Sequence, residues 1–407
     1  MIFVGDDWAE AHHDVCLMTD SGETVGYWKL DEGIEGLSEF HELVAGHVSV
    51  PGDVVVGIET DRGLWVDALV AAGYQVFGIN PLAVARYRQR HHLSGAKSDR
   101  ADAKLLADVV RTDRQNHRRV AGDSALSDAT KVLARSHQNL IWERKRHVNG
   151  LRSRLRDYYP AGVELLSALP QRDAVAVLGR APTPQAGKRL TKPQIKAALK
   201  KGGRQRRLDP RTDEIHQILR IEHLNSPDVV ASAFGATTTA TVAIIETINT
   251  QIVELAHALE ECFREHPDAA IYLSLPGIGD VVGARVLGEF GDDPNRFTDA
   301  KSRRNYAGTS PLTRQSGTRK TVMARWIRKR RLYDAIDQWA FTACNTSPGA
   351  RALYDHRKSQ GDGHHQALRA VGNRLVGFLH GCLKTNTLYN EDIAWAHQQP
   401  ATHAKAA

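Results

Sequence analysis

Short apolar or alternating runs along the first 120 residues predict a mixed β-sheet with helices. They predict strands at 2–5, 14–18, 24–30, 54–58 and 74–79. Apolar positions at helical spacing predict helices at 34–45, 63–72 and 82–90, with a further helix starting at Asp99. A meander of three strands followed by alternating strands and helices is typical of the α/β class. We therefore expect an α/β domain at the N-terminus.

Helical patterns dominate the rest of the chain. Apolar residues at threes, fours and sevens predict long helices at about 123–160 and 240–263. Two such helices pack either as an antiparallel pair or as a dimerising coiled coil. Between them, the basic stretch 188–211 reads as a broken helical insert, and amphipathic helices are predicted again around 326–344 and 365–383. The predicted fold class is therefore α/β plus α.

The length of 407 residues is too great for one ordinary domain. The patterns divide the chain into an α/β domain at 1–120, a helical or coiled-coil region with the basic insert at 121–268, a mainly helical domain at 269–390 and a tail at 391–407. The stretch 305–320 within the third segment is read as a loop.

Charge and cysteine content narrow the classes of protein. The formal net charge is +7, with basic runs at 188–211 and 325–331. Such runs are either solvated helix faces or a surface for a polyanion. The four cysteines show no CxxC spacing, so neither a structural zinc site nor a disulfide framework is expected. There is no signal-peptide pattern and no long uninterrupted apolar stretch, so a soluble, cytoplasmic protein with no membrane contact is expected.

Four acidic residues stand where a ligand site is expected. Asp7 closes the first strand, Glu59 closes the strand at 54–58, and Asp99 and Asp102 lie three apart at the start of a helix. Ligands of open α/β sheets gather at the carboxyl ends of strands. Converging carboxylates repel one another unless a hard cation such as Mg²⁺, or alternatively Mn²⁺, neutralises them. The alternative is structural: Asp99 and Asp102 cap the helix, and the other two acids merely end strands.

Two later stretches carry candidate nucleic-acid contacts. Gly277 and Gly279 flank a tight turn between two predicted helices, and the free N–H groups at the start of the second helix can grip a phosphate. The alternative is a simple αα-hairpin with a glycine turn. Ser316 precedes a glycine in the loop, which from the residues alone is typical of an ordinary turn.

These motifs resemble the DEDD insertion-sequence transposases. The resemblance is carried by Gly5-Asp6-Asp7, Gly57-Ile58-Glu59, Ile79-Asn80-Pro81, Ala96-Lys97-Ser98-Asp99-Arg100-Ala101-Asp102-Ala103, Leu275-Pro276-Gly277-Ile278-Gly279, Gly308-Thr309-Ser310-Pro311 and Ser316-Gly317-Thr318. It implies a RuvC-like, ribonuclease-H-type N-terminal domain and a C-terminal transposase domain with a helix-hairpin-helix-like motif.

The resemblance also implies the roles of single residues. The metal-binding tetrad would be Asp7, Glu59, Asp99 and Asp102, with Asp6 as the alternative to Asp7. Ser316 falls on the family's catalytic serine, and Ser310 is the fallback. The basic residues that flank the loop and could balance phosphate charge are Arg314, Arg319 and Lys320.

The implied function is that of a DNA recombinase that excises and inserts its own mobile element. Mg²⁺ on the tetrad would orient the phosphodiester, and Ser316 would form a transient phosphoserine link. The implied partners are the element ends and target DNA, a structured guide RNA from the element, and further copies of the chain in a dimer or tetramer. Two alternatives remain: a metal-dependent nuclease of the junction-resolvase type without a covalent intermediate, and a non-catalytic nucleic-acid-binding protein.

Overall fold

The computed structural model describes residues 1–91, 98–120, 122–326 and 328–396. The chain divides into two compact units, Met1–Ser124 and Ala125–Ala407. The finer division at 268/269 stays a prediction.

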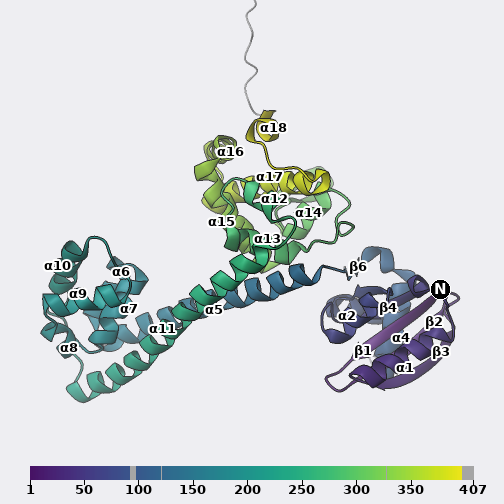
Figure 1. Ribbon diagram of the computed structural model, residues 1–407, viewed down its shortest axis with the longest axis horizontal. Coiled ribbons are helices and arrows are strands. Elements are labelled where there is room, and N and C mark those ends of the chain that lie inside the picture. The colour runs from purple at the N-terminus through teal and green to yellow at the C-terminus, as the bar shows by residue number, and fades with distance from the viewer. Residues whose placement is uncertain (92–97, 121, 327, 397–407) are drawn as a thin grey trace, which may run out of the picture. The chain divides into compact units, whose positions relative to one another are not determined.

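The first unit is built on a six-stranded sheet with the strand order β3-β2-β1-β4-β5-β6. Its strands are β1 (Ile2–Trp8), β2 (His12–Thr19), β3 (Thr24–Asp31), β4 (Val54–Ile58), β5 (Gln75–Gly78) and β6 (Arg118–Arg119). Strands β1, β4 and β5 are parallel neighbours, whereas β2 and β3 continue from β1 as an antiparallel meander. The predicted mixed α/β sheet is confirmed (Figure 1). Strand β6 was not predicted, because its two residues are too few to leave a pattern.

Helices cover both faces of this sheet. The helices are α1 (Ile34–Ala45), α2 (Leu64–Ala71), α3 (Pro81–His91) and α4 (Asp99–Thr112), with short 3-10 turns at Pro51–Asp53 and Arg114–Asn116. Side chains of α1 and α2 pack with Ile2 and Val4 on one face, and α4 packs with Phe3 on the other. A Cβ on Gly5 would lie 1.8 Å from the Ala103 carbonyl oxygen, so only glycine lets α4 lie directly on β1.

The second unit is mostly helical and is organised around the pair α5 (Ala125–Tyr158) and α11 (Asp228–Arg264), which lie side by side in Figure 1. They run antiparallel, because Thr130 near the start of α5 contacts Cys262 near the end of α11, while Tyr158 at the end of α5 bonds Thr238. Of the two predicted arrangements, the chain forms the antiparallel pair. Helix α11 begins well before the predicted residue 240. The pattern did not predict these first turns, because they are rich in small residues and threonines and lack an apolar stripe.

Two hydrophobic cores flank this pair. One core joins the helices α6 (Pro160–Ala168), α7 (Gln171–Arg180), α8 (Pro184–Arg189), α9 (Lys192–Lys201) and α10 (Leu208–Ile218) to the end of α5 and the first half of α11. The other joins α12 (Ala269–Ser274), α13 (Asp280–Phe290), α14 (Ala300–Ala307), α15 (Arg330–Thr346), α16 (Pro348–Ser359), α17 (His364–Thr385) and α18 (Glu391–Trp395). The predicted broken basic insert at 188–211 thus corresponds to the end of α8, α9 and the start of α10.

The stretch that the sequence analysis read as a loop contains a β-hairpin. Strands β7 (Leu312–Ser316) and β8 (Arg319–Met323) pair antiparallel across the two-residue turn Gly317-Thr318. All ten strand residues are exposed. The sequence failed to predict these strands because no buried face imposes alternation of apolar and polar residues on them.

Within the described residues, one helix is long and apolar enough to cross a membrane by length and composition, and it is α11. Helices in the cores of globular proteins can be equally long and apolar. Here α11 packs along α5 and contributes Val242, Ile245 and Phe263 to the two cores.

Candidate functional site

The ends of β1 and β4 bring two of the predicted acids side by side. The parallel register pairs Gly5 with Gly57 and Asp6 with Ile58. Asp7 is the next residue of β1, and Glu59 directly follows the last residue of β4. Residues two apart on a strand share a face. A Cβ on Gly57 would meet Leu106 and Val110 of α4, just as one on Gly5 would meet Ala103. Asp7 therefore belongs to the face of the sheet that α4 covers, and Glu59 directly follows the neighbouring strand.

Asp6 occupies the opposite face and is fully buried there. Its Oδ1 lies 2.8 Å from His13 Nδ1, and its Oδ2 accepts a 2.8 Å hydrogen bond from Trp65 Nε1. Trp65 stacks on His13 at 3.8 Å between ring centroids, and His13 Nε2 reaches Glu32 at 2.6 Å. Burial raises the pKa of the Asp6 carboxyl above its usual range, an effect that His13 and Trp65 only partly offset. Both oxygens of Asp6 are thus engaged away from the face that carries Asp7.

The first turn of α4 carries the other two predicted acids. Ser98 caps this helix, because its Oγ accepts a 3.2 Å hydrogen bond from the Ala101 N–H. The cap is therefore supplied without Asp99 or Asp102. Asp99 is exposed, whereas Asp102 is buried and forms an ion pair with Arg88 of α3.

Carboxylate oxygens are the ligands that Mg²⁺ and Mn²⁺ prefer. Asp7 and Asp102 share the α4 side of the sheet, and Glu59 directly follows the strand next to β1. The donor chemistry of these residues fits such a cation. In the described part of the chain, however, no group of three or more His, Cys, Asp or Glu side chains is arranged to hold a metal. The guanidinium of Arg88 now supplies the positive charge beside Asp102. Metal binding by all four acids would therefore require the Arg88 side chain to move away from Asp102.

Ser316 lies at the last position of β7, directly before the hairpin turn. The register pairs it with Arg319, and Arg314 lies two residues earlier on the same strand. Directly opposed residues and residues two apart share a face of a hairpin, so Arg314, Ser316 and Arg319 lie on one face. Lys320 pairs with Gln315 and belongs to the other face. The structure thus groups Ser316 with two of its three predicted basic neighbours.

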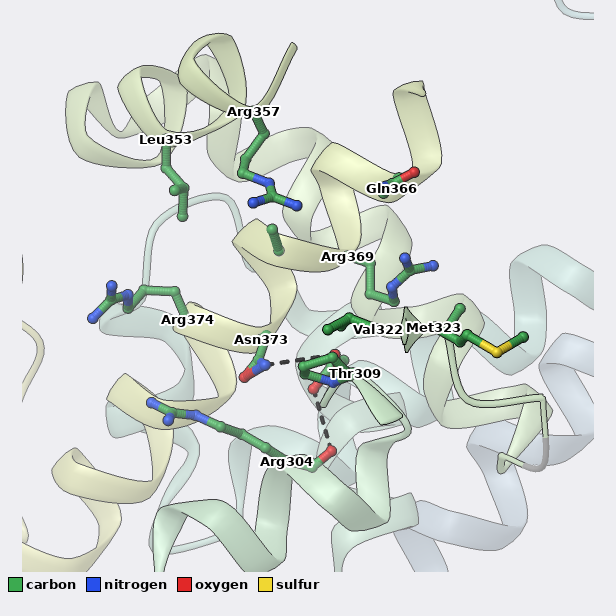
Figure 2. Close-up of a pocket in the computed structure, with 13 residues that line it drawn as sticks. Arg304, Thr309, Val322, Met323, Leu353, Arg357, Gln366, Arg369, Asn373 and Arg374 are labelled. Carbon is green, nitrogen blue, oxygen red and sulfur yellow. Dashed lines mark hydrogen bonds between the residues drawn. The ribbon is translucent and has the colours of Figure 1, made fainter. Parts of the chain in front are cut away.

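The base of the hairpin is anchored to α14 and α17. Gly308 ends α14 with a φ of 71°, a conformation that favours glycine. Thr309 is buried, its Oγ1 donates to the Arg304 carbonyl at 3.3 Å, and its own carbonyl accepts a 3.5 Å hydrogen bond from Asn373 Nδ2 (Figure 2). Ser310, the fallback nucleophile, follows at this anchored base and not on the exposed strands. Asn373 could not be predicted from the sequence, because nothing local links α17 to this motif.

The predicted glycine turn lies between α12 and α13. Gly277 has a φ of 73°, and a Cβ there would lie 2.4 Å from the Ala343 backbone nitrogen of α15. Packing against α15 therefore explains Gly277 without a ligand, whereas Gly279 is exposed. Asp280 is the first residue of α13, and its Oδ1 and Oδ2 accept hydrogen bonds from Arg264 Nε at 2.7 Å and Nη2 at 3.1 Å. A carboxylate therefore already lies at the start of this helix. Phosphate binding at the turn stays a prediction.

Comparison with known proteins adds independent information. A transposase family model matches residues 4–160, and a model described as the transposase IS116/IS110/IS902 family matches residues 269–355. The chain is 42% identical over 400 residues to a Streptomyces coelicolor protein named "Mini-circle putative transposase for IS117", with 97% of each chain covered.

Two further relatives extend over nearly the whole length. The uncharacterized 42 kDa protein of insertion element IS900 from Mycobacterium paratuberculosis is 27% identical, covering 96% of this chain and 97% of its own. The uncharacterized 43.6 kDa protein of insertion element IS110 from Streptomyces coelicolor is 26% identical, covering 95% of each chain. The chain therefore belongs to the IS116/IS110/IS902 family of insertion-sequence transposases, enzymes that bind, cut and transfer DNA.

Proposed function

We propose that this transposase cuts and rejoins DNA through a serine nucleophile, Ser316, assisted by an acidic metal site and guided by RNA. The observation that carries the proposal is the hairpin face on which exposed Ser316 lies between Arg314 and Arg319. A serine at a turn is ordinary, but two guanidinium groups on the same exposed face suit a phosphodiester.

In the proposed step, Ser316 Oγ attacks the phosphorus of the scissile phosphodiester. The new Oγ–P bond forms as the bond between phosphorus and one DNA oxygen breaks. The serine proton is lost, and the departing strand takes up a proton to leave as a hydroxyl. Arg314 and Arg319 would stabilise the negative charge that develops on the phosphoryl oxygens. Because the phosphoserine link conserves the energy of the broken bond, attack by a second strand's hydroxyl would rejoin the DNA.

The proposed metal ligands are Asp7, Glu59, Asp99 and Asp102. Mg²⁺ or Mn²⁺ bound there would polarise the phosphodiester and neutralise its charge. The adjacent ends of β1 and β4 and the first turn of α4 support this assignment. We further propose that the first domain has the RuvC-like, ribonuclease-H-type fold and that α12 and α13 form a helix-hairpin-helix-like motif.

The proposed partners are the element ends, the target DNA and a structured RNA from the element. Base pairing of that RNA would supply sequence specificity, while the protein holds backbone and shape. A cytoplasmic homo-oligomer, a dimer or a tetramer, would combine the acids of one subunit with the serine of another. The family membership supports DNA as a partner.

The competing function is a metal-dependent nuclease that uses the four acids and water alone. The test incubates labelled element-end DNA with flanking RNA and Mg²⁺, and compares wild type, Ser316→Ala, Asp102→Ala and the matched control Ser310→Ala. We expect strand transfer from wild type and Ser310→Ala only, and only with RNA present. DNA cleavage by Ser316→Ala at the wild-type rate would support the competing nuclease function. Strand transfer without RNA would refute the proposal that RNA guides the enzyme.

A further inference from the structure

A pocket of about 710 Å³ lies at the base of the hairpin, outside every site predicted above. It is bounded by the end of β8, the Gly308–Pro311 segment, α14, α16 and α17. A volume of this size is typical of pockets for small molecules of nucleotide size. Val322 and Met323 are among the lining residues, so the hairpin that presents Ser316 also forms one wall of the pocket (Figure 2).

The charge of the lining is wholly positive. Four of the thirteen residues that line the pocket are arginines, and among these described residues none is acidic. Figure 2 shows Arg357 reaching from α16 into the space above Asn373, and Arg304 extending beneath Asn373 towards α17. Arg369 lies on the hairpin side, and Arg374 points outward at the rim. Such a cluster attracts an anion, because each guanidinium offers planar donors that match phosphate oxygens.

The arginines are only partly neutralised by the protein. Arg357 forms an ion pair with Asp362, which lies outside the lining, at 2.5 Å between Nη2 and Oδ2. Within the part of the chain that the structure describes, Nε of Arg304 and Nε of Arg357 are buried and have no hydrogen-bond acceptor. Burial lowers the pKa of the Arg304 guanidinium, and the charge of Arg374 lowers it further. An anion in the pocket would relieve this repulsion between the guanidinium groups.

Apolar and amide groups complete the lining. Leu353 joins Val322 and Met323 as an apolar wall, while Gln366 and Asn373 contribute side-chain amides. An apolar wall beside arginines and amides suits a base attached to a phosphate, since bases stack on flat or apolar groups and bond amides at their edges.

We propose that this pocket holds one unpaired nucleotide of the nucleic-acid strand that the hairpin engages, with its phosphate at the arginines and its base against the apolar wall. The inference rests on the proposed function, since it assumes a strand running along the hairpin. Leu312 pairs with Met323 at the pocket end, and Ser316 lies four residues further along β7. That separation is about 13 Å along the strand, or about four nucleotides of duplex at 3.4 Å each. The nucleotide would therefore lie a few positions away from the phosphodiester that meets Ser316.

The test measures binding of the full chain, without divalent metal, to a labelled mixed-sequence 20-nucleotide DNA strand, the RNA strand of the same sequence and the corresponding DNA duplex. Arg369→Gln removes a pocket charge, and Lys384→Gln removes one charge from the same helix outside the pocket. Ala324→Trp fills the pocket at an exposed residue without changing charge. Thermal melting verifies that each variant is folded.

We expect Arg369→Gln to weaken binding of a single strand about tenfold and to reduce the slope of log affinity against log salt by about one. Ala324→Trp should weaken the single strand but not the duplex, and Lys384→Gln should leave both nearly unchanged. The strand type that loses affinity, DNA or RNA, identifies the source of the nucleotide. Equal behaviour of Arg369→Gln and Lys384→Gln, or equal loss of single-strand and duplex binding in Ala324→Trp, would overturn the proposal. Because no strand is cut, failure of the serine chemistry would leave this readout intact.

Discussion

The environment of single side chains makes the stability of the helical unit depend on pH. His137 of α5 is buried, and its Nδ1 lies 3.3 Å from the Arg285 Nη2 of α13. A neutral imidazole accepts this hydrogen bond, whereas a protonated one would place two cations together. Burial, then the charges of Arg285 and Arg144, lowers the pKa of His137 from 6.5 to about 4.

His137 should therefore destabilise the fold in acid. Because its pKa is lower in the folded state, the unfolded chain takes up the proton first as the pH falls. The stabilisation is complete above pH 6.5 and is lost progressively down to about pH 4. The loss should be at most about 3 kcal/mol. Thermal melting from pH 7 to pH 4 should show a steeper decline for wild type than for His137→Gln, and equal slopes would contradict this.

The ion pair between Arg88 and Asp102 gives a second prediction at this scale. Replacing Arg88 with methionine leaves the buried Asp102 carboxylate without this partner. We expect the variant to lose about 1–3 kcal/mol of unfolding free energy in EDTA and to regain more stability than wild type on addition of Mg²⁺. The control is Arg86→Met, which removes a charge from the same helix. A Mg²⁺ response no larger than that of wild type would argue against Asp102 as a ligand.

Individual chemistry-bearing residues were more predictable than their neighbours in space. The acids at strand ends could be predicted, because apolar runs mark where β1 and β4 stop. The sequence pattern could not choose between Asp6 and Asp7, since both close the same run. Only packing distinguishes them, through Trp65 and His13 on one face and α4 on the other. The arginines of the pocket could not be predicted, because α14, α16 and α17 meet only through tertiary packing.

Among the elements, the hairpin β7–β8 is the one whose stability depends most on a partner. Two strands without a packed face are marginally stable in water, and all of their residues are exposed. Its backbone amides should exchange with deuterium much faster than those of α13 or α17. Protection of the hairpin amides from exchange should rise when the protein binds element-end DNA with its RNA. An equal concentration of heparin fragments, which lack bases, should not raise it. Slow exchange of the hairpin amides in the free protein would contradict the interpretation that β7 and β8 depend on a partner for their stability.

Elements with a buried face could be predicted, and those without one could not. The bounds predicted for α1 and β4 agree with the structure, since each has a strong apolar pattern. The hairpin and β6 were not predicted, because exposed strands and two-residue strands show no alternation of apolar and polar residues. The start of α11 was misplaced for a related reason: its threonine-rich first turns have no apolar stripe and contact the end of α5, where Tyr158 stacks on Phe234 and bonds Thr238.

At the scale of the whole molecule, the two units carry different parts of the proposed chemistry. Met1–Ser124 carries the acids and Ala125–Ala407 carries Ser316. If different subunits complete one site, an oligomer mixed from Asp102→Ala and Ser316→Ala chains should recover part of the strand-transfer activity that each lacks alone. Mixing two preparations of Ser316→Ala is the matched control. No recovery under conditions in which subunits exchange would mean that each subunit uses its own acids and serine.

The most direct test of the serine mechanism locates the covalent link. Wild type, Ser316→Ala and Asp102→Ala are incubated with element-end DNA, flanking RNA and Mg²⁺, denatured, and digested with nuclease and protease before mass spectrometry. We predict that wild type yields a peptide in which a nucleotide is attached through its phosphate to Ser316. Neither variant should yield such a peptide. Cut DNA without any linked peptide in wild type, with cutting unchanged in Ser316→Ala, would contradict the account.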